Sequence, residues 1–116
     1  MTLTLKISDT LVDVFWLDNE SVKDLKKHAK DGLIIEFHQY DDFEQIGTLG
    51  FTLVSNDTLM DVCPGDIVLY NSNQICLYYS TNSLTATKLG HINLGGSEIV
   101  ELLGEEDAVT ITLGLK

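Results

Sequence analysis

Few side chains in this sequence combine the types and the spacing that catalysis or ligand binding requires. The three histidines, His28, His38 and His91, lie far apart and show no metal-ligand spacing. We expect His28 to face solvent from a charged helix and His38 to form a surface pair with Glu36. His91 and Glu44 could form an acid–base pair, although a structural role for His91 and an exposed position for Glu44 are the simpler interpretations.

The other polar candidates are one acid, two thiols and three tyrosines. Asp66 follows Pro64 and Gly65, so its carboxylate is expected to cap the amides of a turn. Cys63 and Cys76 are not in a CxxC or other metal-ligand spacing, and we interpret them as reduced core thiols. The tyrosines are expected to line or fill the interior of the fold, and they are Tyr70, Tyr78 and Tyr79. The chain shows none of the common hydrolase, metalloprotease or nucleotide-binding motifs, and neither a cofactor nor a metal is expected.

The charge of the chain argues against two classes of partner. Its net charge is −11, and all seven of its basic side chains are lysines. Nucleic acids and anionic membranes are bound by clustered Lys and Arg, so neither is an expected partner. No apolar run reaches the length of a membrane span, and the N-terminal residues lack the features of a signal peptide, which predicts a cytoplasmic protein.

These side chains must be positioned mainly by strands. Apolar alternation and turn residues predict about eight strands, at residues 2–8, 11–17, 33–40, 43–49, 67–70, 75–79, 84–93 and 108–115, with a further short strand around 51–54. Asn19 can cap a helix that ends at Gly32, and Ser97 can cap a second over 98–103. Such spacing is typical of an antiparallel barrel or sandwich, and two short helices could plug the ends of a barrel.

The central segment, residues 61–80, is a hairpin entered by the Pro64-Gly65-Asp66 turn. Its first strand, from Ile67 to Tyr70, is too apolar for a strand covered on one face only, which predicts cover on both faces. Glycines at positions 47 and 50 indicate bends or a close approach of the backbone in the preceding region.

Five short motifs follow one another in a distinctive order. They are Glu44-Gln45-Ile46, Pro64-Gly65-Asp66-Ile67, Leu77-Tyr78-Tyr79, Leu89-Gly90-His91-Ile92 and a final Val109-x-Ile111-x-Leu113 strand. This order resembles that of the small bacterial and archaeal cyclophilin-like proteins, a family of largely uncharacterised function. The resemblance implies one domain over residues 1–116, a mainly β fold with a closed antiparallel eight-stranded barrel and two short helices.

The resemblance also directs the functional expectations. It points to ligand-binding residues Glu44, Tyr70, Tyr78 and His91. True cyclophilins polarise the prolyl amide with an arginine, and this chain has none, so we expect no prolyl isomerase activity. The first hypothesis is a non-catalytic protein that binds a small molecule or a peptide segment in a pocket on the side of the barrel. The alternatives are an enzyme that uses His91 and Glu44, and a structural or regulatory partner protein that forms a homodimer.

Overall fold

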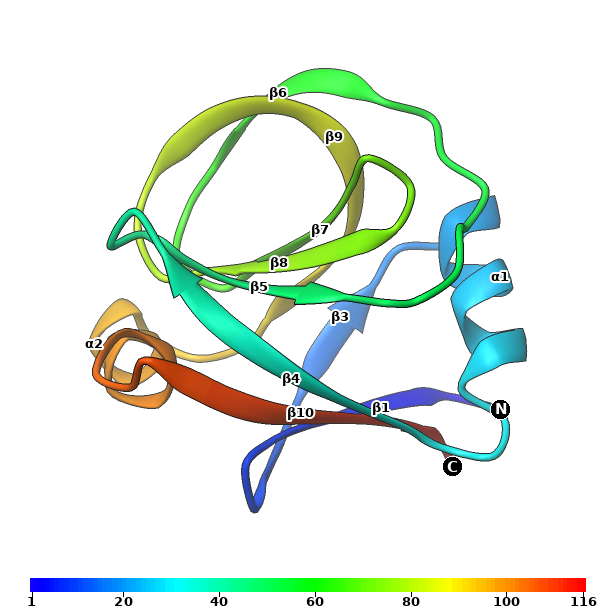
Figure 1. Cartoon of the computed structure of the whole chain (residues 1–116), viewed down its shortest axis with the longest axis horizontal. Coiled ribbons are helices and arrows are strands. Elements are labelled where there is room, and N and C mark those ends of the chain that lie inside the picture. The colour runs from blue at the N-terminus through cyan, green and yellow to red at the C-terminus, as the bar shows by residue number, and fades with distance from the viewer.

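The computed structural model describes residues 1–116, which form ten strands and three short helical segments (Figure 1). The strands are β1 (Leu3–Ile7), β2 (Thr10–Val12), β3 (Val14–Trp16), β4 (Leu33–Tyr40), β5 (Glu44–Thr48), β6 (Thr58–Val62), β7 (Asp66–Tyr70), β8 (Gln74–Tyr78), β9 (Asn82–Ile92) and β10 (Ala108–Leu115). The helical segments are α1 (Glu20–His28), α2 (Gly96–Ile99) and the π-helical turn η1 (Val100–Gly104).

The sheet closes on itself because its two end strands are consecutive pieces of the chain. The strands are hydrogen-bonded in the order β2-β1-β10-β4-β5-β8-β7-β9-β3, and neighbours are antiparallel. Only Asp13 separates β2 from β3, so one interrupted stretch supplies both edges. Strand β6 pairs only with β9 and is not part of the wall. If β2 and β3 are counted as one interrupted strand, eight strands form the wall. The predicted closed antiparallel barrel is therefore confirmed, and the interruption and β6 account for the higher strand count.

Alternating apolar side chains fill the interior of the barrel. On β10, Val109, Ile111 and Leu113 are buried as predicted, and their partners on β4, Phe37 and Ile35, belong to the same core cluster. Intervening side chains on these strands point outward because the side-chain period of a strand is two.

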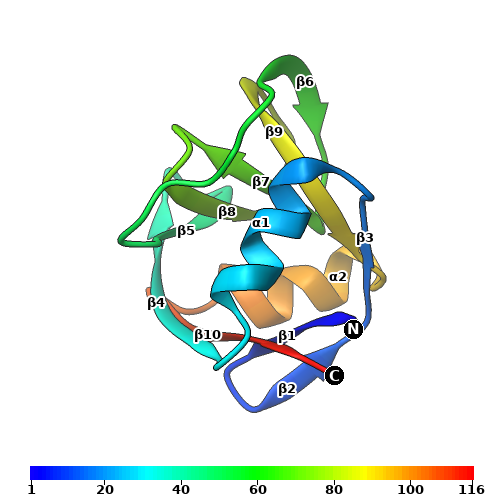
Figure 2. The ribbon, with the colours of Figure 1, turned by 90° about the vertical axis from the view of Figure 1, so that its right-hand side faces the viewer.

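The two helical regions add to this core from different sides of the barrel (Figures 1 and 2). Leu25 of α1 and Ile99 and Leu103 of the α2–η1 region are fully buried in the cluster. Asn19 caps α1 as predicted, since its Oδ1 accepts a hydrogen bond from the Val22 N–H at 2.9 Å. No helix in the structure is both long enough and apolar enough to cross a membrane.

A second, smaller core lies outside the barrel wall. The long strand β9 curves away from the barrel, and β6 pairs with its first half (Figure 1). The apolar side chains beneath this β6–β9 layer come from β6, β7, β8 and β9, and they are Val62, Val68, Cys76, Tyr78 and Ala86. Strand β7 is consequently covered on both faces, as its apolar sequence predicted.

Three local predictions are wrong. Residues 51–54 form no strand; the segment is instead held to α1, where the Val54 N–H donates to Asp24 and Phe51 stacks on His28 with ring centroids 3.8 Å apart. His28 is exposed, as predicted, and Phe51 is its aromatic partner. Cys63 is exposed and is therefore not a core thiol, whereas Cys76 is buried as predicted. The residue that precedes α2 is Gly95 and not Ser97, and no side chain caps this helix.

Candidate functional site

Side chains on the outer faces of β5 and β8 form one wall of a pocket on the outside of the barrel. The register places Glu44 opposite Tyr78, Ile46 opposite Cys76 and Thr48 opposite Gln74. These six residues line a pocket of about 530 Å³, a volume typical of small-ligand sites. The period of two brings them to one face, while the intervening residues of both strands face the barrel interior.

The pocket exists because other elements extend over this face. Asn82 and Leu84 at the start of β9 line it, and Tyr40 and His38 come from the neighbouring strand β4. Phe43 lies parallel to Tyr78 with their ring centroids 6.3 Å apart, which adds an aromatic wall.

Strand β5 is also fixed from behind, which holds the pocket wall in place. Gln45 is buried in the interior, and its Nε2 donates to the carbonyl oxygens of Leu103 and Glu106, each at 2.8 Å. The first bond satisfies a carbonyl group near the end of η1, and the second satisfies one in the loop that follows η1. The position of Glu44 on the opposite face is thereby tied to the barrel core.

Glu44 is the most unusual side chain of the pocket. It is only 4% exposed, contrary to the expected exposed position, and its Oε2 has no hydrogen-bond partner. Burial raises the pKa of Glu44 above its ordinary value, an interaction with the Tyr78 hydroxyl opposes that rise, and Asp41 adds to it. A buried acceptor without a partner costs free energy, so the carboxyl group favours a donor delivered from the pocket.

The two other buried titratable groups of the pocket remain neutral at physiological pH. Burial raises the pKa of the Cys76 thiol, and the nearby Glu44 raises it further. Burial likewise raises the pKa of the Tyr78 hydroxyl, which interacts with the Glu44 carboxyl group. Neither group is available as an anionic nucleophile or base near pH 7.

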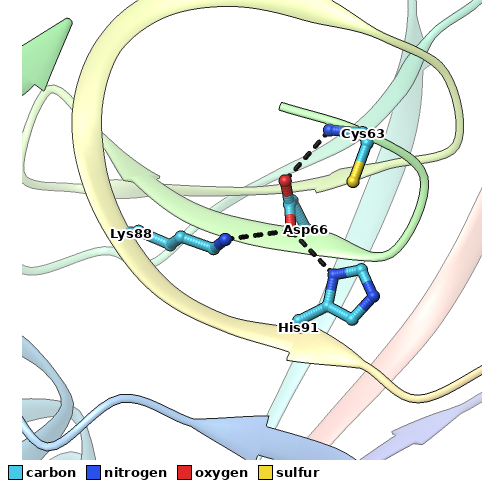
Figure 3. Close-up of polar contacts among 4 residues, drawn as sticks. All are labelled: Cys63, Asp66, Lys88 and His91. Atoms are coloured by element: carbon cyan, nitrogen blue, oxygen red, sulfur yellow. Dashed lines mark hydrogen bonds and ion pairs between the residues drawn. The ribbon is translucent and has the colours of Figure 1, made fainter. Parts of the chain in front are cut away.

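His91 lies in a separate cluster, centred on Asp66 (Figure 3). Asp66 Oδ1 is 2.7 Å from His91 Nδ1 and 3.3 Å from Lys88 Nζ, and Oδ2 accepts a hydrogen bond from the Cys63 N–H at 2.9 Å. The last bond confirms that Asp66 caps an amide of its turn. Burial alone would raise the pKa of Asp66, but the Cys63 N–H, His91 and Lys88 together hold it below its ordinary value.

The structure thus divides the four residues named from the sequence. Glu44, Tyr70 and Tyr78 line one pocket, whereas His91 is not among the residues that line it. His91 is instead paired with Asp66, so the suggested acid–base pair of His91 and Glu44 does not form one site.

Sequence reasoning missed several residues of the pocket. The polar and thiol side chains that it did not name include Gln74, Cys76 and Asn82. Gln74, Cys76 and Tyr78 are two residues apart, so the period of two along a strand could have grouped them on one face.

Comparison with known proteins gives one match. A family model described as the cyclophilin-like family matches residues 5–114, nearly the whole chain. No curated protein and no solved structure matches the sequence.

Proposed function

Since the chain belongs to the cyclophilin-like family, we propose that it is a binding protein that holds a small molecule or the side chain of a peptide segment in the pocket on the outer wall of the barrel. The preferred ligand has an apolar body and an N–H or O–H donor. The apolar body would lie against the aromatic and aliphatic walls, and the donor would reach Glu44.

One observation carries this proposal: the unpartnered Oε2 of the buried Glu44 on the wall of the pocket. This oxygen has no partner within the protein and almost no accessible surface, so a small movement of the Glu44 side chain must bring it to a donor in the pocket. A ligand donor would therefore add a hydrogen bond without first displacing one. An acceptor-only ligand, such as a carboxylate, would instead face another acidic group.

The titration behaviour of the pocket argues against a thiol or phenol nucleophile. The pKa values of Cys76 and Tyr78 are raised, so each of these two groups is shifted toward its uncharged form. Nucleophilic or base catalysis needs the opposite shift for a thiol or a phenol. The chain also has no arginine to polarise a prolyl amide, which argues against isomerase activity.

A titration followed by ¹⁵N–¹H NMR tests the proposal with two probes of similar shape. Benzylamine combines an aromatic body with an ammonium donor, and phenylacetate combines a similar body with an acceptor. We expect benzylamine to bind at about millimolar concentration, because small fragments bind weakly, and to shift the amide signals of β5 and β8. Phenylacetate should shift them little.

Two matched variants assign the interaction to the Glu44 side chain. Glu44→Gln should weaken benzylamine binding by about tenfold, since a hydrogen bond to a charged group contributes roughly 1.5–3 kcal/mol. Glu36→Gln changes an exposed acid on β4 that does not line the pocket, and it should leave binding unchanged. Equal affinity of benzylamine for Glu44→Gln and the wild type, or no saturable shift in β5 and β8, would refute the proposal.

A further inference from the structure

The turn that precedes β7 brings three metal-ligating side chains together outside the ligand pocket. Cys63, Asp66 and His91 each offer a ligand atom, and the three atoms lie within 4.8 Å of one another (Figure 3). The turn and β9 are far apart in sequence, and they meet here because Asp66 of β7 is the register partner of His91 on β9.

The backbone fixes these side chains in place. Gly65 adopts a left-handed φ of +101°, its N–H donates to the Tyr78 carbonyl oxygen, and its own carbonyl oxygen accepts from the Ile92 N–H, both at 2.8 Å. A Cβ atom at this position would lie 3.0 Å from His91 Cε1, so the glycine allows the turn to approach the imidazole closely. The turn is therefore tied to β8 and β9 on either side of the cluster.

We propose that Cys63, Asp66 and His91 bind a divalent transition-metal ion of the Zn²⁺ type, with the fourth coordination position open to solvent. Thiolate, imidazole and carboxylate are the ligands that Zn²⁺ takes in proteins, whereas Ca²⁺ and Mg²⁺ require oxygen ligands. Three protein ligands and one open position form a common zinc arrangement.

The geometry allows this site to close with small movements. Ligand atoms of tetrahedral zinc are roughly 3.3–3.8 Å apart, given Zn–N and Zn–S distances of about 2.0–2.3 Å. The Cys63 side chain is exposed, so rotation about its χ1 angle can bring the sulfur closer. The metal replaces the proton on the Cys63 sulfur and the proton in the hydrogen bond between His91 Nδ1 and Asp66 Oδ1.

The alternative use of the same residues, a thiol nucleophile activated by histidine, fits the structure less well. A catalytic thiol is hydrogen-bonded to its base. Here the Cys63 thiol interacts with the Asp66 carboxylate, and burial and this carboxylate raise the pKa of Cys63. A nearby anion disfavours a free thiolate but favours a bound cation, so the arrangement suits a metal better than a nucleophile.

Lys88 provides a further test of the metal site. Its ammonium group is 3.3 Å from Asp66 Oδ1, where its charge opposes that of a metal ion. The side chain is 42% exposed and can move away when a metal binds. Removal of this charge by Lys88→Gln should therefore strengthen metal binding severalfold.

Titration of the reduced full-length protein with Co²⁺, followed by Zn²⁺ competition, measures the site. Co²⁺ bound to a thiolate gives a charge-transfer absorption band in the near ultraviolet. We expect one equivalent of Co²⁺ to produce this band and Zn²⁺ to abolish it. Cys63→Ser should remove the band and weaken Zn²⁺ binding at least tenfold, and His91→Gln should weaken it similarly.

His28→Gln is the matched control, because this histidine lies on α1 and stacks on Phe51. It should leave both the band and the affinity unchanged, and circular dichroism should show that all variants remain folded. Three results would overturn the proposal: no Co²⁺ band in the wild type, a band that persists in Cys63→Ser, or weaker binding in Lys88→Gln. Cys63→Ser and Lys88→Gln alter exposed side chains, so the test does not depend on whether His91→Gln folds.

Discussion

At the scale of single residues, function depends on which face of a strand a side chain occupies. Along β5, Gln45 and Gly47 turn toward the barrel interior, while Glu44, Ile46 and Thr48 line the outer pocket. An acid on the outer face of a barrel wall is normally solvated. Glu44 is buried instead, on a pocket wall that it shares with Phe43 and with the start of β9, and this burial is the basis of the binding role proposed for it.

The raised pKa of Glu44 predicts a stability that depends on pH. The folded protein holds the proton on Glu44 more tightly than the unfolded chain, whose value is near 4.5. Below that value both states are protonated, and as pH rises through the folded pKa the wild type loses stability. Glu44→Gln should therefore be more stable than the wild type at pH 8, by about 1 kcal/mol, and the two should be equally stable at pH 4.

Urea denaturation at the two pH values measures this difference. Glu36→Gln, which changes an exposed acid on β4, should show no comparable dependence on pH. If the advantage of Glu44→Gln over the wild type were the same at pH 4 and pH 8, the titration of Glu44 would not be its cause.

Residue types predicted local roles better than they predicted partners. The cap at Asn19 and the turn-capping role of Asp66 are local interactions within three residues, and both were predicted from the sequence. The pairing of Asp66 with His91 and the burial of Glu44 depend on strands that meet only in the folded barrel. Alternation in the sequence shows that a strand has two faces but does not reveal what covers the outer one.

At the scale of elements, the β6–β9 layer was the least predictable part of the fold. Strand β6 has only one neighbour, β9, and three of its residues are exposed, so its alternation is weak. A more apolar segment, residues 51–54, was predicted as a strand instead. Its buried residue Leu53 packs in the core of the barrel, and Ser21 and Asp24 of α1 bind its backbone, so these contacts take the place of a strand partner.

The close approach of β5 to β4 gives a prediction at this scale. A Cβ atom at Gly47 would overlap the fully buried ring of Phe37, with the Cζ atom only 2.8 Å away. Gly47→Ala should destabilise the protein by roughly 1–3 kcal/mol, because the added methyl group overpacks a close-packed core around the fully buried Phe37 ring. The free energy of unfolding in urea measures this loss.

Gly96→Ala is the matched control for this substitution. No atom lies within 4 Å of a Cβ built at Gly96, and alanine is favoured over glycine in a helix such as α2. This variant should be as stable as the wild type or more stable by up to about 1 kcal/mol. A Gly47→Ala variant of unchanged stability would show that Phe37 does not pack on this strand as described.

At the scale of the whole molecule, the closed sheet depends on a short seam between β3 and β9. Only three residue pairs form it, Val14–Ile92, Phe15–His91 and Trp16–Gly90. Hydrogen bonds extend it at both ends, from the Leu17 N–H to the Leu89 carbonyl and from the Asn93 N–H to the Asp13 carbonyl, each at 2.9 Å. The spacing of strands in the sequence left a barrel and a sandwich as alternatives, because closure of the sheet depends on this long-range pairing. The family resemblance correctly predicted the barrel.

The seam leads to a prediction about how the barrel unfolds. Trp16, the single tryptophan, lies in the seam, and its Nε1 donates to the Leu3 carbonyl oxygen at 2.9 Å. Cys76 is buried in strand β8, away from the seam. Side chains from strands around the barrel and from both helical regions share one core cluster, so opening the seam would expose the whole core. We therefore expect the seam and β8 to unfold together in one two-state transition.

Two probes on the Cys63→Ser variant, in which Cys76 is the only thiol, can follow this transition. Trp16 fluorescence and the rate of Cys76 labelling should give the same urea midpoint, and without urea the labelling of Cys76 should be at least about 10³-fold slower than in the unfolded chain. In the wild type, the exposed Cys63 should react in the folded state, which provides the internal control. A Trp16 transition at a lower urea concentration than that of Cys76 would show that the seam opens first, and that the barrel is closed by a separable contact and not by a shared core.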